Sequence, residues 1–483
     1  MKLKELLANV SVLQVNADLE MNIDSVEYDS RKVTPGSLFV AITGFAADGN
    51  RFIPMALEKG AVAVVTAVKP EQDIPYILVE SDRLALAQIG CNFFGNPSKE
   101  MTMIGVTGTN GKTSVTLLLK QVLEKVTGEK VGLIGTMENQ IGDLAIPSER
   151  TTPESFELQR LFAQMRHAGC RYVVMEVSSH AVALERVGGV HFRVAAFTNL
   201  SEDHLDFHKT MEDYCDTKAE LFHRCDKAVL NRDDPWFARM KKGIACPDMT
   251  TGVKSSADLH AENLQLHADG ISFTAVRGEE SVPVKLQVPG RFTVYNALTV
   301  LAIACQLGIS LADAADALAS AKGVKGRVEV VPTEGMPYTV LVDYAHTPDG
   351  LENVLKSVRD FCKGRIIAVF GCGGNRDPIK RPIMGKIGTE LSDFAVITSD
   401  NPRNEDPMAI IEDIMKGVEV PQERYAIIEN RRKAIRYAMD KAEKNDIIVL
   451  AGKGHETYQE IQGVKHHLDE REEVSAYLKE VRK

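Results

Sequence analysis

The sequence IGVTGTNGKTS, at residues 104–114, joins a predicted strand to a predicted helix. Apolar residues are continuous over Met103–Val106, and they recur at helical spacing over Thr113–Val126. A glycine-rich loop at such a junction offers backbone N–H groups and the positive end of a helix dipole to phosphate groups. Lys112 would reach the outer phosphates of a nucleotide, and the Thr113 hydroxyl would bind Mg²⁺. Residue 106 is Val where the G-x-x-x-x-G-K-[ST] pattern has Gly, so the predicted nucleotide site depends on the strand–loop–helix context.

Apolar runs on both sides of this stretch predict strands that are buried on both faces, as in the parallel sheets of α/β proteins. Most of these runs end in a cluster of polar residues or glycine. Because parallel sheets bind ligands at the carboxyl ends of their strands, we expect ligand sites there. The runs are Ser37–Ala41, Ala61–Val65, Tyr172–Val177, Val194–Phe197, Arg365–Phe370, Phe394–Thr398 and Asp446–Leu450.

The length of 483 residues exceeds what one hydrophobic core usually organises, which predicts more than one domain. The pattern changes at the turn-rich segment Gly95–Lys99 and again after the Ala-rich helix predicted for Leu311–Ala321. We therefore predict an α/β protein of three domains, at residues 1–98, 99–325 and 326–483. The first is a mixed α/β domain, the second a P-loop-type domain with a mostly parallel sheet, and the third a Rossmann-like domain.

Composition and charge exclude several classes of protein. The net charge of −10 supplies no global positive field, which argues against nucleic-acid binding. The eight Cys are scattered without the spacing of a metal site, which predicts reduced thiols in the cytosol. Met1–Glu5 lacks the apolar core of a signal peptide, and the apolar stretch Ala297–Ile309 is too short to span a bilayer. We expect a cytoplasmic protein that does not insert into membranes.

Several motifs, taken in order, resemble those of the Mur ligases, the family that builds the peptide of bacterial cell-wall precursors. They cover the second and third predicted domains and lie at Gly108–Thr113, Glu176–His180, Asn199–Asp206, Asn296–Leu298, Gly326–Arg327, Asp343–Pro348 and Gly452–Glu456. The resemblance implies a UDP-substrate domain, a central ATPase and a domain that binds the incoming amino acid. In this family ATP phosphorylates a carboxylate, and an amine then attacks the acyl phosphate.

The resemblance implies which residues bind ATP and Mg²⁺. Glu176 and Thr113 would be metal ligands, His204 would hold a second Mg²⁺, and Arg327 and Asp343 would lie near the phosphates and the ribose. Lys218 matches the lysine that the family carbamylates, and a carbamate, unlike an ammonium, can bind Mg²⁺. Lys112, Lys218, His204 and Glu176 would form the catalytic group. The implied ATP-binding residues are Gly108, Thr109, Asn110, Gly111, Lys112, Thr113, Ser114, Asn296, Arg327 and Asp343.

The residues before the nucleotide loop resemble the UDP-binding domain of two members of the family. Ser30 would contact the uridine diphosphate, whereas Phe45–Ala47 occupies a loop that begins with His in some relatives. The residues implied to hold the muramoyl dipeptide are Thr151, Thr152, Ser178 and Arg186. Without the resemblance, Thr151–Pro153 would be a simple turn.

The motif Asp400–Arg403 implies which amino acid is added. Family members that add meso-diaminopimelate carry Arg in this motif, and those that add lysine lack it. Diaminopimelate has a distal carboxylate that lysine lacks, and Arg403 could pair with it through two charge-assisted hydrogen bonds. The residues implied to bind diaminopimelate are Arg376, Asp400, Asn401, Pro402, Arg403, Gly452 and Glu456, where Glu456 would accept from the distal ammonium.

The resemblance therefore implies an ATP-dependent ligase of peptidoglycan precursor synthesis. It would add meso-diaminopimelate to the D-Glu γ-carboxylate of UDP-N-acetylmuramoyl-L-Ala-D-Glu, with Mg²⁺ and as a monomer. The alternatives are the lysine-adding ligase of the same family and, more remotely, a folylpolyglutamate-synthase-like ligase. Arg403 argues against the first, and the ~98 residues before the nucleotide loop argue against the second. A nucleotide-dependent scaffold without chemistry belongs to a different class, and ADP release upon adding both substrates would exclude it.

Overall fold

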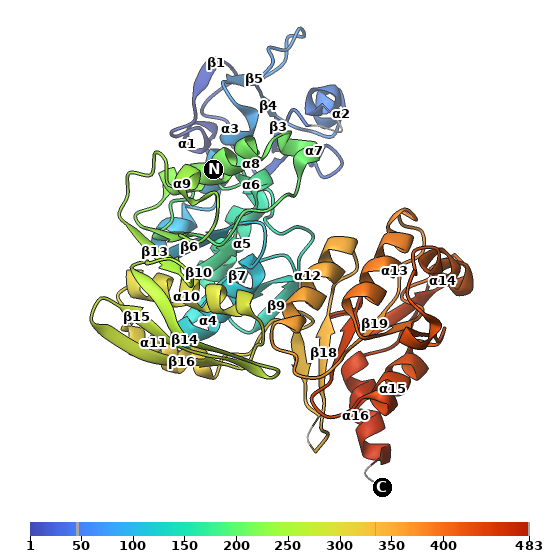
Figure 1. The fold of residues 1–483 in the computed structure, drawn as a ribbon. Coiled ribbons are helices and arrows are strands. Elements are labelled where there is room, and N and C mark those ends of the chain that lie inside the picture. The colour runs from blue at the N-terminus through green and yellow to red at the C-terminus, as the bar shows by residue number, and fades with distance from the viewer. Residues whose placement is uncertain (45–47, 334, 482–483) are drawn as a thin grey trace. The chain divides into compact units, whose positions relative to one another are not determined.

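The computed structural model describes residues 1–44, 48–333 and 335–481. The loop at Phe45–Ala47, where the resemblance left a contact in doubt, lies outside the described residues. The chain divides into two compact units (Figure 1). The first is Met1–Asp258 with Thr299–Ser310, and the second is Leu259–Leu298 with Leu311–Lys483. Each unit is described here by itself.

The N-terminal part of the first unit is a five-stranded sheet in the order β1-β5-β4-β3-β2. Strands β2 to β5 are parallel, and β1 is antiparallel to β5. Every residue of β3 is buried, because helices α2 and α3 pack against it. The elements are α1 (Leu3–Leu6), β1 (Val12–Asn16), β2 (Ser25–Glu27), β3 (Ser37–Ala41), α2 (Ile53–Glu58), β4 (Ala63–Thr66), β5 (Tyr76–Val79) and α3 (Asp82–Phe93).

The rest of the first unit is built on a second sheet, in which β6 lies between β10 and β11. Strands β6, β7 and β10 to β13 are parallel, and β8 and β9 extend the sheet in antiparallel pairing. The chain leaves β6 toward β7 and later returns on the other side at β11, so the loop after β6 lies at a topological switch point. The strands are β6 (Thr102–Thr107), β7 (Lys130–Ile134), β8 (Glu138–Ile141), β9 (Leu144–Pro147), β10 (Cys170–Glu176), β11 (Val194–Phe197), β12 (Ala228–Asn231) and β13 (Asp248–Gly252).

Helices follow these strands as the sequence predicts for an α/β unit. Helix α4 follows β6 and packs against β7 and β10, and it buries Val115, Leu118, Leu119, Val122 and Leu123. The helices are α4 (Lys112–Thr127), α5 (Ser155–His167), α6 (Ser179–Ala183), α7 (Leu205–His208), α8 (Met211–Ala219) and α9 (Phe237–Met240). None of the helices that the structure describes has both the length and the apolar composition required to cross a membrane.

The second unit begins with an antiparallel meander. The meander is β14 (Leu259–His267), β15 (Gly270–Arg277) and β16 (Glu280–Leu286), and α11 (Leu311–Ala319) packs against β16. Helix α10 (Arg291–Gln306) begins in this unit, and its residues from Thr299 onward belong to the first unit.

A doubly wound sheet forms the C-terminal part of the second unit, in the order β17-β18-β22-β19-β20-β21. Side chains of each strand alternate between two cores: Val449 packs with α12 to α14, and Leu450 packs with α15 and α16. Figure 1 shows these helices on both sides of β18 and β19. The elements are β17 (Glu329–Val331), β18 (Thr339–Asp343), α12 (Pro348–Arg359), β19 (Ile366–Phe370), α13 (Lys380–Leu391), β20 (Phe394–Ile397), α14 (Pro407–Met415), β21 (Tyr425–Ile427), α15 (Arg431–Lys441), β22 (Ile447–Ala451), β23 (Tyr458–Ile461), β24 (Val464–His467) and α16 (Glu470–Val481).

The eight predicted strands, Met103–Val106 included, are confirmed, and their ends agree with the prediction or differ from it by one or two residues. The predicted helices at Thr113–Val126 and Leu311–Ala321 correspond to α4 and α11, and most of the apolar stretch Ala297–Ile309 lies in α10.

Candidate active site

The loop between β6 and α4 needs glycine at Gly108 and Gly111. Gly108 has φ +144°, and a Cβ there would lie 2.0 Å from the Thr198 hydroxyl oxygen. Gly111 has φ +86° and directly precedes the first turn of α4, where Thr113 and Ser114 lie. Both glycines are therefore required by the backbone and not only by a ligand.

The segment after β11 holds this loop in place. Asn110 N–H donates to the Asn199 side-chain oxygen at 3.0 Å, and the Asn199 amide donates back to the Asn110 carbonyl at 3.0 Å. Thr109 N–H donates to the Asn199 carbonyl at 2.8 Å. Two motifs about 90 residues apart thus form one rigid unit at the carboxyl ends of β6 and β11.

Two lysines, Lys218 buried and Lys112 partly buried, converge on the same carbonyl oxygen. Lys112 Nζ donates to the Gly108 oxygen at 2.8 Å, and Lys218 Nζ donates to it at 3.2 Å. Burial lowers the pKa of Lys112, although Glu176 partly opposes this. Burial and the neighbouring Lys112 hold the pKa of Lys218 well below its usual value. A free amine at position 218 is therefore much better populated near neutral pH than on a surface lysine.

Glu176, at the end of β10, is a buried carboxylate held by hydrogen bonds from one neighbour. Its two oxygens accept from Thr136, from the backbone N–H at 2.9 Å and from the hydroxyl at 3.0 Å. A Cβ at Gly135 would lie 2.6 Å from the same carboxylate. Only 1% of Glu176 is exposed, and the carboxylate acts on the charge of Lys112. Anionic oxygen, hydroxyl oxygen and ammonium groups therefore lie around the glycine-rich loop between β6 and α4.

His204 lies at the edge of this group and remains half exposed. Its backbone has φ +53°, and its ring meets the His180 ring edge to face at 4.9 Å. No group of three or more His, Cys, Asp or Glu suited to a metal ion occurs within residues 1–44, 48–333 and 335–481. The predicted set Thr113, Glu176, His204 and Lys218 contains only two residues of those types, so its metal-binding role stays a prediction.

Residues predicted to hold the muramoyl dipeptide lie next to Glu176. The Thr152 hydroxyl donates to the Glu176 carbonyl at 2.8 Å and accepts from Ser178 N–H at 3.2 Å. Arg186 donates to the Thr152 carbonyl at 3.2 Å. The Thr151 hydroxyl lies 2.9 Å from that of Thr136. Four of the five predicted dipeptide and uridine contacts thus form one group at the end of β10.

Ser30 lies apart from that group, buried in the N-terminal sheet domain. Its hydroxyl is 3.5 Å from the Met55 sulfur, and the residue is 7% exposed. The structure thus assigns Ser30 a buried position with a weak sulfur acceptor, and its contact with uridine diphosphate stays a prediction.

Arg83 was not singled out by the sequence, but it belongs with Arg186. Three guanidinium groups surround the Glu154 carboxylate: Arg83 at 3.7 Å, Arg150 at 3.7 Å and Arg186 at 3.5 Å. One carboxylate cannot neutralise three cations, so this region carries excess positive charge that suits a substrate with carboxylates. Nothing in the helical pattern around Arg83 distinguishes it from a solvated surface arginine.

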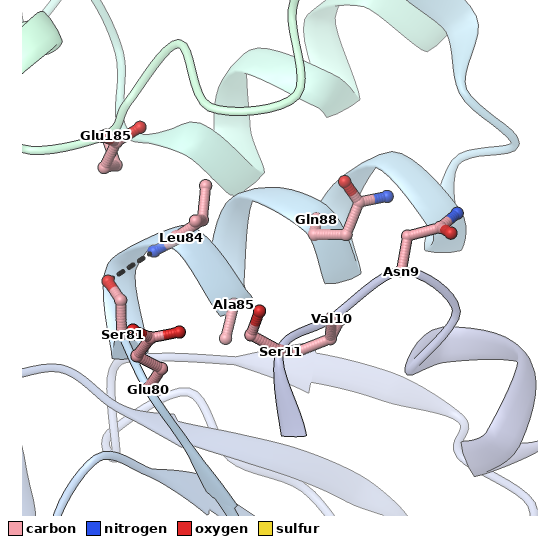
Figure 2. A pocket seen from close by; sticks show the side chains of 9 residues that line it. All are labelled: Asn9, Val10, Ser11, Glu80, Ser81, Leu84, Ala85, Gln88 and Glu185. Atoms are coloured by element: carbon pink, nitrogen blue, oxygen red, sulfur yellow. Dashed lines mark hydrogen bonds between the residues drawn. The ribbon is translucent and has the colours of Figure 1, made fainter. Parts of the chain in front are cut away.

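A cavity of about 390 Å³ lies beside this region, and none of the predicted site residues lines it. Its walls come from Asn9–Ser11, from Glu80 and Ser81, from one face of α3 and from Glu185 (Figure 2). Ser81 caps α3 by accepting from Leu84 N–H at 3.3 Å. Glu185 is already paired with Arg224 at 2.9 Å.

The predicted nucleotide contacts in the second unit are already engaged with the protein. Both oxygens of Asp343 accept backbone hydrogen bonds, from Val328 and Ala345 at 2.8 Å, and burial raises its pKa. The Arg327 guanidinium lies 5.3 Å over the Tyr344 ring. Asn296 is a buried residue of α10.

The predicted diaminopimelate residues gather at the carboxyl ends of β19, β20 and β22. The Asn401 amide donates to Glu456 Oε2 at 2.9 Å. Gly452 has φ +119°, and a Cβ there would lie 2.5 Å from Asp400. Arg403 donates to the Gly374 carbonyl at 2.8 Å and lies 3.5 Å from Glu460. Pro402 is buried between these residues, whereas Arg376 is exposed.

Lys453 is the centre of this second site, although the sequence assigned it no role. The signal was present, because Lys453 lies inside the Gly452–Glu456 motif directly after a buried strand. A lysine inside a glycine-rich turn normally extends into water, so the motif alone gave no reason to expect it to be buried.

Models of Mur ligase domains match most of the chain. The description "Mur ligase middle domain" matches residues 106–304, "Mur ligase, glutamate ligase domain" matches 326–454, and "Mur ligase family, catalytic domain" matches 22–90.

Several relatives that carry the name of an enzyme align with the chain over its full length. A UDP-N-acetylmuramoyl-L-alanyl-D-glutamate--2,6-diaminopimelate ligase of Clostridium acetobutylicum is 48% identical over 484 residues, and the alignment covers 100% of both chains. The enzyme of that name from Clostridium tetani is 47% identical, again over 100% of both chains. A solved structure titled with the same ligase name superposes with a TM-score of 0.78 at 30% identity and covers 100% of this chain and 99% of the other.

Proposed function

The chain belongs to the Mur ligase family, and from this we propose that it joins 2,6-diaminopimelate to UDP-N-acetylmuramoyl-L-alanyl-D-glutamate at the expense of ATP. It is an ATP-dependent acid–amino-acid ligase of peptidoglycan precursor synthesis with the three-domain architecture of the family. The observation that carries the assignment is the full-length identity of 47–48% to ligases named for this reaction. The domain boundaries at 98/99 and 325/326 remain part of the proposal.

ATP binds at the loop before α4, where Gly108–Gly111 present backbone N–H groups to the phosphates. Lys112 bonds to loop carbonyls at 2.8 and 2.9 Å in the described state, and it exchanges these for phosphate oxygens when the nucleotide binds. The γ-phosphoryl group passes to the D-Glu side-chain carboxylate, ADP leaves, and an acyl phosphate forms. A buried cation favours this step because it offsets the repulsion between carboxylate and phosphate.

The donor set beside this loop fits Mg²⁺, which prefers oxygen ligands. The Glu176 carboxylate is buried and is held only by Thr136 among the described residues, so it retains lone pairs for a cation. Thr113 in the first turn of α4 supplies a hydroxyl, and His204 lies at the open edge of the group. When bound, Mg²⁺ would neutralise charge on the transferring phosphate.

Lys218 completes the oxygen set as a carbamate. Its amine attacks CO₂, the new N–C bond forms, and the amine proton is released to solvent. The depressed pKa favours this reaction because only the unprotonated amine attacks. The product is an anion beside Lys112, so carbamylation replaces a repulsion between two buried amines with an attraction.

The muramoyl dipeptide lies along Thr151, Thr152, Ser178 and Arg186, and Ser30 contacts its uridine diphosphate. The excess positive charge of Arg83, Arg150 and Arg186 around Glu154 supports this placement, because the dipeptide carries carboxylates.

Diaminopimelate, as its meso isomer, binds at Asp400–Arg403 with Arg376, Gly452 and Glu456. Arg403 pairs with the distal carboxylate, and Glu456 accepts from the distal ammonium. The reacting amine then attacks the acyl phosphate carbon, the amide bond forms, and inorganic phosphate leaves with the electron pair of the broken C–O bond. We also propose that the enzyme acts in the cytoplasm as a monomer.

Arg403→Ala tests the choice of amino acid. Diaminopimelate and lysine are compared in the purified enzyme by phosphate release with the dipeptide and ATP present. We expect the preference for diaminopimelate, as a ratio of kcat/KM values, to fall roughly 10- to 100-fold, since a charge-assisted hydrogen bond contributes about 1.5–3 kcal/mol.

Arg359→Ala is the matched control, because Arg359 is an arginine of the same sheet domain that pairs with the exposed Asp393 at 2.8 Å. Its preference should equal that of the wild type. An unchanged preference in Arg403→Ala would reject this role of Arg403, and a wild-type enzyme that consumes ATP only with lysine would favour the lysine-adding alternative.

A further inference from the structure

Lys453 is the most completely buried cation of the second unit that faces the predicted amino-acid site. It is 0% exposed, and its Nζ donates to Asn401 Oδ1 at 2.8 Å and to Glu456 Oε2 at 3.0 Å. Asp400 lies 3.9 Å from the same ammonium. Burying an ammonium is costly unless it is hydrogen-bonded and near an opposite charge, so the acceptors Asn401 and Glu456 and the nearby carboxylate of Asp400 stabilise Lys453 in this position.

The contacts of Lys453 form a closed triangle with Asn401 and Glu456. The Asn401 amide also donates to Glu456 Oε2, at 2.9 Å, and Asn401 Oδ1 accepts additionally from Glu460 N–H at 2.9 Å. Both polar atoms of the Asn401 side chain therefore form hydrogen bonds: the nitrogen donates to Glu456, and the oxygen accepts from Lys453 and from Glu460 N–H. A residue that could otherwise rotate its amide is held in one orientation.

The triangle leaves the two oxygens of Glu456 in different environments. Oε2 accepts two hydrogen bonds, whereas no residue in the described part of the chain donates to Oε1. The side chain is 15% exposed, so Oε1 is free to accept from a ligand. Lys453 thereby determines which oxygen is offered and in which direction.

The surrounding charges leave this site negative. Arg431 and Glu470 form a fully buried pair at 2.7 Å, and Arg431 also lies 4.0 Å from Asp400. The two buried cations Arg431 and Lys453 thus face the three carboxylates of Asp400, Glu456 and Glu470. One of the Asp400 oxygens, Oδ2, is buried without a hydrogen-bond partner within the described residues. The remaining negative charge suits an ammonium group of the ligand.

We propose that Lys453 is a positioning residue that sets the preference of this site for an amino acid with a second, distal ammonium group. The inference deepens the proposed function and depends on it. Lys453 does not touch the substrate, but it holds Asn401 and one oxygen of Glu456, so that the other oxygen meets the distal ammonium.

Lys453→Met tests this with two substrates that differ by one ammonium group, diaminopimelate and 2-aminopimelate. Both carry the distal carboxylate, so the contact with Arg403 is the same for each. We expect the wild type to prefer diaminopimelate and the variant to lose at least tenfold of that preference in kcat/KM. In the variant, the KM for diaminopimelate should increase, whereas the KM values for ATP and the muramoyl dipeptide should stay unchanged.

Arg365→Met is the control for loss of a cation that pairs with a buried carboxylate in the same sheet domain. Arg365 pairs with buried Asp446 at 2.7 Å at the amino ends of β19 and β22, opposite to the site. It should retain the wild-type preference. If Lys453→Met does not fold, Lys453→Gln, which keeps a donor in a similar volume, provides the same comparison.

The outcomes separate the two proposals. An equal loss with both amino acids in the folded variants, or no loss, overturns the role of Lys453 and leaves the proposed function intact. A wild-type enzyme that uses neither amino acid with the muramoyl dipeptide overturns the proposed function itself.

Discussion

Lys112 and Lys218 illustrate at the residue scale how burial sets reactivity. Their amines share the carbonyl oxygen of Gly108, at 2.8 and 3.2 Å; Lys218 is 1% exposed, and Lys112 is partly buried. Two ammonium groups so close together, one of them buried, would repel each other because solvent screens them only in part. The proposed carbamylation of Lys218 would remove that repulsion.

Lys218→Ala should reduce kcat by on the order of 10²–10³-fold, as expected when a preorganised charged group is removed beside a transferring phosphate. Short carboxylic acids in the buffer should partly restore the rate, because a small carboxylate fits the space and the charge of the lost carbamate. The measurement is ADP release with and without added acetate.

Lys120→Ala serves as the control, since Lys120 is a nearly buried lysine that pairs with Glu124 at 2.7 Å on α4 and lies outside the predicted site. Acetate should leave its rate unchanged. An undiminished rate in Lys218→Ala would rule out the carbamate.

At the scale of elements, the loop between β6 and α4 depends on a backbone that only glycine adopts without strain. Gly108 has φ +144°, and Thr198 from the segment after β11 occupies the space of a Cβ. The hydrogen bonds between Asn110 and Asn199 then transmit any displacement of one segment to the other.

Gly108→Ala should lower kcat/KM for ATP at least about 100-fold, because a displacement near 1 Å at a positioned phosphate costs about that much. Nucleotide binding by calorimetry and steady-state rates provide the measurement. Gly128→Ala at the other end of α4 is the control: its φ is +70°, but nothing lies within 4 Å of a Cβ there. We expect Gly128→Ala to cost about 1 kcal/mol of stability and to retain activity. Equal activity in both variants would contradict the steric argument.

The hairpin β23–β24 is an element whose role only the structure reveals. Gln459 donates to the Asp400 carbonyl at 2.6 Å, and Arg403 N–H donates to the Glu460 carbonyl at 3.0 Å. The hairpin thus holds the Asp400–Arg403 loop along its length. Its sequence is short and mostly polar and shows no strong hydrophobic periodicity, so the sequence predicts a loop there.

For the molecule as a whole, stability against acid depends on which carboxylates are buried. Arg365–Asp446 and Arg359–Asp393 are ion pairs of 2.7 and 2.8 Å in the same sheet domain, with arginines of similar exposure. Asp446 is 3% exposed and Asp393 is 40% exposed. Burial alone would raise the pKa of Asp446, but hydrogen bonds from Arg365 and Glu443 lower it below its ordinary value.

Because the folded-state pKa of Asp446 is depressed, its contribution to stability is present above the unfolded-state pKa near 4 and is lost as pH falls through the folded value. Arg365→Met should therefore lower the free energy of unfolding at pH 7 by about 1–3 kcal/mol, less than for a fully buried pair because Arg365 is partly exposed. Loss of stability should also begin at higher pH, since burial then acts on Asp446 with fewer opposing hydrogen bonds.

Hydrogen exchange of the β19 and β22 amides, at pH 7 and near pH 4, measures these changes in the sheet concerned. Arg359→Met, whose carboxylate partner is exposed, should change the free energy of unfolding by less than about 1 kcal/mol. If the free energy of unfolding depends on pH in the same way in Arg365→Met and Arg359→Met, burial of Asp446 does not set the stability against acid.

Local patterns allowed much of the fold to be predicted. Apolar runs such as Val194–Phe197 and Phe394–Ile397 identified the strands of both α/β sheets, because a strand buried on both faces must be apolar throughout. The edge meander β14–β16 was missed, since exposed residues alternate along β14 and β16 and weaken its apolar signal. Within the site, Gly108, Lys112 and Glu176 were accessible from the sequence because each lies at the end of a buried strand or at the start of a helix.

By itself the sequence determined the class of the sheets, the position of the glycine-rich loop between β6 and α4, and a resemblance that named the reaction. These depend on the order of residues along the chain, which periodicity and motifs record. Only the tertiary structure decided that Lys218 joins Lys112 at one carbonyl, that Arg83 joins Arg186 around Glu154, and that Lys453 is buried against Asn401 and Glu456. Burial and long-range contact set the charge and the pKa of such groups, and neither follows from local sequence, because both depend on which distant segments exclude water from them.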